Sequence, residues 1–559
     1  MTRRKSPRSK PPAAGRSEAP RLADAPPPPA PDEPTGGPAP PPPEATEGVK
    51  LAEAPDAPPG NGAAARAFDV AVVGAGIGGL AVAALLARTG RSVVLLERAA
   101  EVGGACQPIV RDGYRFDAGA TFFAGAGPRG ALTTLLMRLG IDLPRTACDP
   151  TLQTALPRHR LTFSRNPERW WPEIRREVPD DEPGWRSLLA ELAVLASDRD
   201  GLVAMLPALP PEGWRARLRF GQSLARQYLF SATRQAARRL RKAEETPLRA
   251  TLARVGLGPV SQQVLEACLW YLVLRDADEC STLEAALALR RLTEGAMEVS
   301  GGPMALASCL AARLRQDGGE VRLLTEVAGC LVERGRVSGV ITRAGETIRA
   351  RFVVTDVPPP ILAQRLLPER RGRLSRRLPI EGPWQSLAVA QVMVLAVPEA
   401  YLPSELGGQC LVVLDAGRPA TGENLAFVRL GSDRTQEQDP KGLRCLSVGR
   451  FVSPSAPTDA ESLTQALMEA AEQVVPGVGE AAAYRAVLPP ETLGDLWGRP
   501  LASVRYAPDS RQWLGRRGLP HQTGWPGVLA VGEGTYPGRL ISDVLEGAIE
   551  VADRIAMAV

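Results

Sequence analysis

The chain has 559 residues, of which 44% are hydrophobic, and a formal net charge of +5 at pH 7. This length exceeds what one small core organises, so two or more domains are expected, and so modest a charge does not by itself imply nucleic-acid binding. The eight cysteines form no CxxC pair and only two histidines are present, His159 and His521, which argues against a disulfide scaffold, a zinc ribbon or a histidine-rich metal site.

The N-terminal 65 residues are rich in proline and alanine and contain almost no large apolar side chain. Such a segment cannot bury enough surface to fold, so we expect a disordered tail or linker, with docking of its polyproline run on a partner as the alternative. The first ten residues are basic but are not followed by the apolar core of a secretory signal, which favours a cytoplasmic location. The longest apolar run, Leu387 to Val397, is about half of the roughly 20 residues needed to span a bilayer and predicts a buried strand.

The first strong pattern is a strand, a glycine-rich turn and a helix that begin at Phe68. The apolar run "DVAVV" predicts a strand of a buried parallel sheet. Gly74 suits the tight turn, Gly76 a close approach of the backbone to a pyrophosphate, and Gly79 close packing of the helix on the strand. The helix then directs its N-terminal amides at the phosphates and ends at Gly90.

A second strand, "SVVLLE", ends in Glu97, about 20 residues after the glycines, where an acid binds ribose hydroxyls. A carboxylate at this position repels a 2′-phosphate, so NADP is disfavoured. Together these features predict a dinucleotide site in a Rossmann-like α/β domain.

Two further segments distinguish FAD from NAD. Gly103 and Gly104, in "VGGAC", resemble the extended motif of FAD-dependent oxidoreductases, and "VLAVGEGTYPGRLISDVLEGA" near the C-terminus resembles their second flavin motif. The resemblance implies FAD as the cofactor and, as its contacts, Gly74, Gly76, Gly78, Gly79, Glu97, Arg98, Gly103, Gly104, Ala105, Val327, Gly532, Glu533, Ile541 and Ser542. Ser542 and Asp543 also offer a helix cap, with Glu546 at capping-box spacing.

The order of these segments predicts an FAD domain assembled from separate pieces, with an α+β substrate domain inserted between them. Strand and turn signals at Arg334-Gly335 and Ala344-Gly345 predict a hairpin, and Ser281 with Glu284 predicts a helix start. The expected divisions are a tail over 1–65, the FAD domain over 66–150, 301–360 and 521–559, and the substrate domain over 151–300 and 361–520.

Over nearly all of 66–559 the chain resembles the carotenoid desaturase and isomerase family, relatives of phytoene desaturase and retinol saturase. The likeness rests on "VGGACQPIVRDGYRFDAGATFFAG", "GGPMALASCLAARLRQDGGEVRLLTEV" and "VGEGTYPG", and the later segments are most similar to carotenoid 3′,4′-desaturases. It implies an enzyme in which a polyene in an apolar tunnel transfers a hydride to the flavin, with desaturation favoured over saturation or isomerisation. Asp117 and Thr121 are implied to come near the flavin, and no catalytic side chain is assigned.

Two departures from the family pattern keep other functions open. Arg539, Leu540 and Ile541 stand where relatives have small residues, which predicts a narrower pocket. Glu533 replaces an aspartate that is common in the family and is typical of flavin amine oxidases, so an amine oxidase is the first alternative. A non-catalytic lipid carrier on the same fold, as in Rab GDP-dissociation inhibitors, is the second.

Residues 214–242 form a basic amphipathic pattern without an acid. Trp214 and Leu218 fall on its apolar face and Arg219 and Arg239 on its basic face. Either this segment lies on an anionic membrane surface, as a peripheral contact through which a polyene enters, or it is a core-facing helix with a solvated basic face. No nucleic-acid module accompanies it, and nothing in the pattern sets the oligomeric state. His521 is expected in a surface loop, and Cys106 as a small buried side chain.

Overall fold

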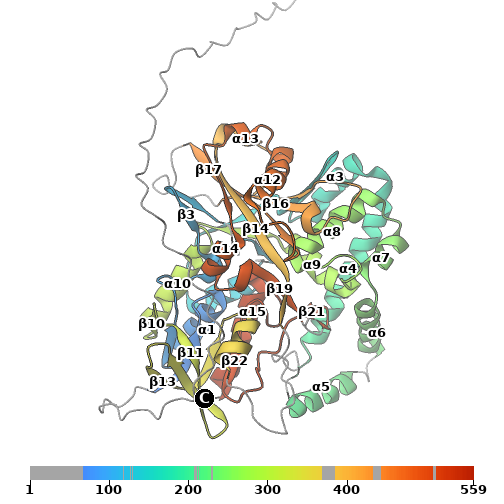
Figure 1. The fold of residues 1–559 in the computed structure, drawn as a ribbon. Coiled ribbons are helices and arrows are strands. Elements are labelled where there is room, and N and C mark those ends of the chain that lie inside the picture. Colours follow the sequence, from blue (N-terminus) through green and yellow to red (C-terminus); the bar gives the residue numbers. More distant parts are fainter. Residues whose placement is uncertain are drawn as a thin grey trace, which may run out of the picture. The chain divides into compact units, whose positions relative to one another are not determined.

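The structure is a computed structural model (Figure 1), which describes residues 67–117, 119–125, 127–128, 130–206, 211, 213–227, 231–367, 384–431, 442–507 and 512–558, with side chains left out at 213–216, 227, 231 and 232. The predicted tail therefore lies outside the described residues. The described residues include two large sheets.

The first sheet has seven strands in the order β10, β2, β1, β13, β12 and β11, with β22 paired to β13. Their bounds are Glu320–Arg322, Val93–Leu96, Phe68–Val73, Thr347–Thr355, Arg336–Thr342, Val327–Glu333 and Val528–Ala530. β1 pairs in parallel with both β2 and β13, so the carboxyl ends of these strands meet at one edge. β11 and β12 form the predicted hairpin, with Arg334 and Gly335 at positive φ in its turn, so that prediction is confirmed.

Three helices pack together beside this sheet: α1 (Ile77–Arg88), α10 (Pro303–Gln316) and α15 (Ile541–Ala558). Every residue of α1 from Ile77 to Ala87 is buried, because the helix is covered by the sheet, α10 and α15. This burial explains why α1 is apolar on all sides rather than amphipathic. The fold class predicted from the sequence, an α/β arrangement with a parallel dinucleotide-binding core, is confirmed.

The second sheet has eight strands in the order β18, β14, β17, β16, β15, β7 and β8, with β19 paired to β14. Their bounds are Tyr484–Leu488, Gln385–Pro398, Leu443–Val452, Leu425–Leu430, Gln409–Val413, Leu152–Leu156, His159–Phe163 and Ser503–Ala507. The apolar run Leu387 to Val397 lies within β14, which pairs with β17, β18 and β19. The prediction of a buried strand there is confirmed.

A helix layer follows β8 in the chain, and one of its helices packs against β7 and β15 of this second sheet. The helices are α3 (Trp170–Glu177), α4 (Glu182–Val203), α5 (Gly213–Gln227), α6 (Ser231–Glu245), α7 (Leu248–Val255), α8 (Pro259–Val273) and α9 (Thr282–Glu294). α9 begins as predicted, because the Ser281 hydroxyl accepts a hydrogen bond from the Glu284 amide at 3.0 Å. No helix in the described part of the chain combines the length and apolar character required to cross a bilayer.

The basic segment 214–242 divides between α5 and α6, with residues 228–230 outside the described set. α6 buries Ala237 and Leu240, and its Arg239 pairs with Asp198 of α4 at 2.7 Å, so this arginine does not lie on a free basic face. α5 differs, because Leu218 is 54% exposed between the exposed Arg217 and Arg219. The two halves of the segment therefore have different surroundings (Figure 1).

The described residues contain five more α-helices and seven more strands. They are α2 (Ala131–Leu139), α11 (Pro359–Ile361), α12 (Ala460–Val474), α13 (Val478–Ala481), α14 (Pro490–Trp497), β3 (Ile109–Arg111), β4 (Tyr114–Phe116), β5 (Phe123–Ala124), β6 (Arg145–Cys148), β9 (Ala296–Val299), β20 (Gln512–Trp513) and β21 (Arg516–Arg517). α12 packs on β15, β16 and β17, and α14 lies close to β14.

Candidate functional site

The turn between β1 and α1 has the geometry that its glycines predict. Gly74 has φ +98°, and a Cβ placed on Gly79 would lie 2.2 Å from the Gly74 carbonyl oxygen. A Cβ on Gly78 would meet Val544 of α15 at 3.1 Å. A side chain at Gly79 would collide with the turn itself and one at Gly78 would crowd α15, so the close packing of this turn requires glycine.

Glu97 is held at the end of β2 by the backbone of the turn. Its Oε2 accepts a hydrogen bond from the Ala75 amide at 2.7 Å, and its Oε1 accepts one from the Ala99 amide at 2.9 Å. The Gly103 amide donates to the Ala75 carbonyl at 2.8 Å, so the Gly103-Gly104 segment folds back onto the glycine turn. These sequence-predicted residues are thus brought together.

The other predicted contacts on this side vary in position. Val327 opens β11, two residues after Thr325, whose amide donates to the Glu97 carbonyl at 2.7 Å. Arg98 is exposed and donates to the Asp495 carbonyl at 3.3 Å, on α14. This hydrogen bond holds the Arg98 side chain at α14 and not at the glycine turn.

Asp356, which the sequence analysis did not single out, lies inside the glycine turn. Its Oδ2 accepts a hydrogen bond from the Gly79 amide at 2.8 Å, and ideal Cβ atoms on Gly76 and Gly532 would each lie 2.5 Å from its carboxylate. Burial raises the pKa of Asp356 to about 7, the Gly79 bond opposes this, and the Glu533 and Glu97 carboxylates add to it. Asp356 follows β13 directly, and the rule that ligands lie at the carboxyl ends of parallel strands could have identified it.

The C-terminal segment brings Gly532 and Glu533 to the same place. Gly532 has φ +109° beside Asp356, and Glu533 pairs with Arg499 at 2.6 Å. Burial lowers the pKa of Arg499, but the attraction of Glu533 and other acids outweighs it, so the net pKa is raised. Arg499 lies just after the end of α14, and the sequence did not predict a role for it.

The start of α15 differs from the predicted cap. Asp543 Oδ2 accepts a hydrogen bond from the Leu540 amide at 3.2 Å, so Asp543 itself reaches back to the helix start. The Ser542 hydroxyl is buried without a hydrogen-bond partner among the described residues, and Glu546 pairs with Arg516 at 2.5 Å. Of the predicted cap by Ser542 and Asp543, only Asp543 bonds to the helix start, and the predicted capping box with Glu546 is not formed, because Arg516 pairs with the Glu546 carboxylate.

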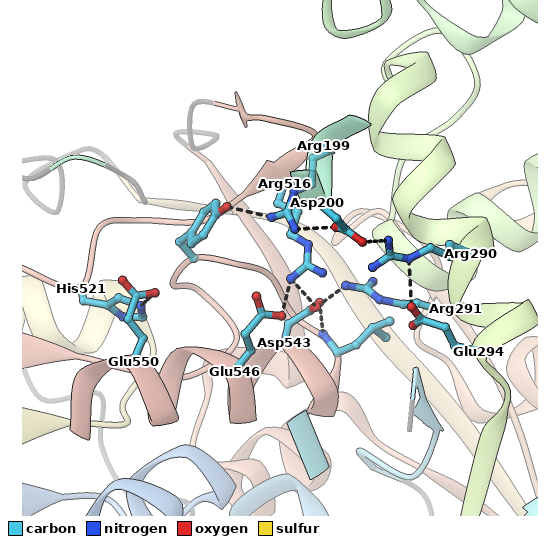
Figure 2. Close-up of polar contacts among 12 residues, drawn as sticks. Arg199, Asp200, Arg290, Arg291, Glu294, Arg516, His521, Asp543, Glu546 and Glu550 are labelled. Atoms are coloured by element: carbon cyan, nitrogen blue, oxygen red, sulfur yellow. Dashed lines mark hydrogen bonds and ion pairs between the residues drawn. The ribbon is translucent and has the colours of Figure 1, made fainter. Parts of the chain in front are cut away.

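Figure 2 shows how far this ionic network extends from α15. Asp543 pairs with Arg291 of α9, and Arg516 of β21 lies 3.8 Å from the same carboxylate (Figure 2). Arg199 of α4 lies 3.4 Å from the Tyr536 hydroxyl. The network ties the helix layer to the predicted flavin segment, which fixes the start of α15 in place.

A cavity lies beside this helix start. We name it the aromatic cavity, after Phe122, Tyr271, Phe427 and Phe451, whose ring centroids are separated by 5.4–6.2 Å. Its lining also includes the sequence-predicted residues Ala105, Asp117, Thr121, Glu533 and Ile541, together with Arg429 and Arg539. The structure therefore gathers both pocket candidates and three predicted cofactor contacts around one cavity.

A second cavity adjoins the first and shares Val504, Glu533 and Arg539 with it. We name it the arginine-lined cavity. Its wall is formed by residues of α8, α9, β19 and β21. A ligand that extends beyond the aromatic cavity has space here.

The sequence also predicted whether two single side chains, those of His521 and Cys106, are buried. His521 is fully buried, its Nδ1 lies 2.9 Å from the Ala530 carbonyl oxygen, and burial lowers its pKa to about 4. The expected surface position is wrong, because the loop that carries His521 packs under α15. Cys106 is buried and burial raises the pKa of its thiol to about 12, which makes it the small inert side chain that was predicted.

The residues present fit a flavin dinucleotide. Glycine keeps the turn before α1 tightly packed, and Glu97 is held at the end of β2 at that turn. The Ser542 hydroxyl, at the start of α15 where the flavin is expected, is buried and unbonded among the described residues. Fold and site together define a dinucleotide-dependent oxidoreductase.

Comparison with known proteins identifies the family. Residues 77–556 match the model of the family described as flavin containing amine oxidoreductase. The chain therefore belongs to the flavin-containing amine oxidoreductase family, and FAD is its cofactor.

Individual relatives narrow this class. The chain is 25% identical over 526 residues to the phytoene desaturase (neurosporene-forming) of Cereibacter sphaeroides, an alignment that covers 87% of this chain and 94% of the relative. It is 24% identical over 301 residues to a 4,4′-diapophytoene desaturase of Methylomonas sp., covering 51% and 53% of the two chains. Among solved structures, an oxidoreductase from Methanosarcina mazei matches with a TM-score of 0.60 at 18% identity, covering 87% of this chain and 99% of that one. Putrescine oxidase bound to putrescine matches with a TM-score of 0.56 at 14% identity, covering 88% and 99%, and shows the fold alone.

Proposed function

We propose that the protein is an FAD-dependent desaturase of a carotenoid or related polyene. The observation that carries the proposal is the aromatic cavity, which adjoins Glu533 and Ile541 of the predicted flavin segment. Four aromatic rings offer a long conjugated chain apolar area and face-to-edge contacts. The phytoene desaturase of Cereibacter sphaeroides, similar over 94% of its length, supports the same substrate class.

The residues of the chain bind and orient in this reaction. Bound FAD supplies the acceptor for a hydride and its two electrons. The glycine turn and Glu97 hold the dinucleotide, and the aromatic cavity holds the polyene and excludes water. The network around Asp543 and Arg291 holds the start of α15 in place beside the cavity.

The amine oxidase alternative is opposed by the charge of the aromatic cavity. Arg429, Arg499 and Arg539 line it, against the two carboxylates of Asp117 and Glu533. An amine is a cation at neutral pH and is repelled by an excess of guanidinium groups. The lipid-carrier alternative needs no flavin, so membership of a flavin-containing family opposes it.

The proposal is tested by pigment analysis. The full chain, and a Glu97→Lys variant as control, are expressed in separate hosts that accumulate phytoene, lycopene or a hydroxylated carotene. A desaturase produces a pigment with red-shifted absorption that the control lacks, because each added conjugated double bond moves absorption to longer wavelength.

Other results would change the assignment. A blue shift identifies a saturase, and a changed cis band at constant conjugation identifies an isomerase. Unchanged pigments in every host, with FAD bound to the purified protein, contradict a carotenoid substrate.

We also propose that α5 is a peripheral contact with anionic lipid. Support comes from the exposed Leu218 between Arg217 and Arg219, on a helix without an acid. Leu218→Asp is expected to reduce co-sedimentation with phosphatidylserine-containing vesicles by about threefold, while Leu240→Ala, on the buried side of α6, leaves the bound fraction of the folded protein unchanged. Equal binding of Leu218→Asp and the unsubstituted protein contradicts this role.

A further inference from the structure

Eight arginines line the aromatic and arginine-lined cavities, and they divide into two groups. Six have a carboxylate oxygen within 4.0 Å: Arg275, Arg291, Arg499, Arg505, Arg516 and Arg517. The other two, Arg429 and Arg539, form no ion pair with any described residue. Both line the aromatic cavity.

Arg429 lies on β16, among the aromatic rings of this cavity. Its Nε and Nη1 are buried and have no hydrogen-bond partner among the described residues. Burial lowers the pKa of Arg429, and the charges of Tyr271, Asp117 and Glu298 offset this only in part.

Arg539 is held at the junction of the two cavities. Its Nη1 donates to the Tyr271 carbonyl at 3.1 Å, and its guanidinium carbon lies 5.4 Å from the centre of the Phe451 ring. Its Nε is buried without a hydrogen-bond partner among the described residues. These contacts fix the orientation of the guanidinium, yet none of them neutralises its charge.

Both positive charges act on one point of the cavity. Burial raises the pKa of the Tyr271 phenol, and Arg429 and Arg539 each lower it. Arg429, Arg539 and Tyr271 all line the aromatic cavity, so both guanidinium groups lie around the same space. A buried cation without a partner is unfavourable, and a plain hydrocarbon in the cavity does not neutralise it.

We infer that the substrate is a polyene that carries a carboxylate at one end, and that Arg429 and Arg539 bind this carboxylate in the aromatic cavity. The inference rests on the proposed polyene function. A carboxylate matches the planar fork of a guanidinium and is the anion that two such groups hold most directly. The aromatic rings of Tyr271, Phe427 and Phe451 then take the conjugated chain. Binding one end in this way fixes which bond of the chain lies beside the start of α15, so the same contact sets the position of desaturation.

The test compares two polyenes that differ only in the end group. Dissociation constants of all-trans-retinoate and all-trans-retinol are measured on the full-length FAD-loaded protein, from the change in flavin absorption. We expect retinoate to bind about tenfold or more tightly than retinol. Arg429→Gln and Arg539→Gln are expected to reduce this ratio about tenfold while retinol binding stays the same.

Two variants control for charge and folding. Arg517→Gln removes an arginine from the arginine-lined cavity whose charge is already paired with Glu284 at 3.3 Å, and it should leave the ratio unchanged. Arg429→Lys keeps the charge and should recover part of the preference. FAD content and melting temperature show that each variant is folded.

The outcomes separate the inference from the function on which it rests. If the unsubstituted protein binds retinol and retinoate equally, or if both glutamine variants keep the preference, the inference is wrong and the polyene function stands. If neither polyene binds to the FAD-loaded protein, the proposed function fails and the inference falls with it. Loss of FAD from Arg429→Gln or Arg539→Gln also overturns it, because the anion held by the arginines is then the cofactor.

Discussion

The glycine turn and the aromatic cavity are the two halves of the candidate site, and they are built in opposite ways. The turn lies in one continuous segment, from Phe68 to Glu97, and presents mainly backbone amides. The cavity is formed by side chains that come from α8, β16, β17 and the start of α15. A backbone site depends on local conformation, whereas a side-chain site depends on how distant elements pack.

The two regions also differ in charge. Asp356 and Glu97 place carboxylates at the turn, where a pyrophosphate is expected. Arg429 and Arg539 place guanidinium groups without carboxylate partners in the described part of the cavity. The turn thus offers a phosphate its backbone amides, whereas the cavity offers its ligand the positive charges of side chains.

The largest expected effect comes from breaking the backbone half. Gly79→Ala places a Cβ 2.2 Å from the Gly74 carbonyl oxygen and should lower the free energy of unfolding by about 3 kcal/mol, with loss of bound FAD. Gly201→Ala is the matched control, since Gly201 is also helical but its Cβ meets no atom within 4 Å. It should be neutral or stabilising by up to about 1 kcal/mol. Denaturant unfolding and flavin absorbance measure both, and FAD retention in Gly79→Ala would contradict the role of the turn.

The next effect tests the network that joins the two halves. Asp543→Ala leaves the buried Arg291 without its carboxylate and removes the bond to the Leu540 amide, so we expect a loss of about 3 kcal/mol in the free energy of unfolding. Asp553→Ala, on the same helix, breaks an exposed pair with Arg138 and should cost less than about 1 kcal/mol. Equal losses in the two variants would show that the buried network has no special part in holding α15.

A smaller effect concerns the pH dependence of the turn. The pKa of Asp356 is about 7 in the folded protein against an ordinary value of 3.8, so the folded chain keeps a proton that the unfolded chain has lost between these values. The stabilising contribution of this group is complete below about pH 4 and is lost as pH rises through about 7. The free energy of unfolding of the FAD-free protein should therefore fall across this range, and Asp356→Asn should remove this fall.

The same group predicts the affinity for FAD. An ionised Asp356 repels a pyrophosphate, so FAD should bind about tenfold more tightly at pH 6 than at pH 8. Asp356→Asn keeps the acceptor for the Gly79 amide and should bind FAD equally at both pH values. Fluorescence titration with FAD provides the measurement, and a pH dependence that survives in the variant would exclude Asp356 as its cause.

Predictions from sequence succeeded where residues act within one segment. The strand, turn and helix at Phe68–Arg88, the hairpin at Arg334-Gly335 and the helix start at Ser281 all depend on neighbours within a few positions. The predicted capping box with Glu546 and the predicted surface position of His521 failed because distant elements decide them: Arg516 pairs with Glu546, and α15 covers the loop that carries His521.

The sequence by itself determined the FAD-type α/β fold, the glycine turn and Glu97, because local backbone geometry and the periodicity of apolar residues specify them. Only the tertiary structure placed Asp356 inside the turn, 277 positions from the Gly79 amide to which it is bonded, and Arg499 beside Glu533. Only the tertiary structure shows that six of the cavity arginines have carboxylate partners and that Arg429 and Arg539 have none among the described residues. The physical reason is that neutralisation of a buried charge depends on distances between side chains, which the order of residues does not specify.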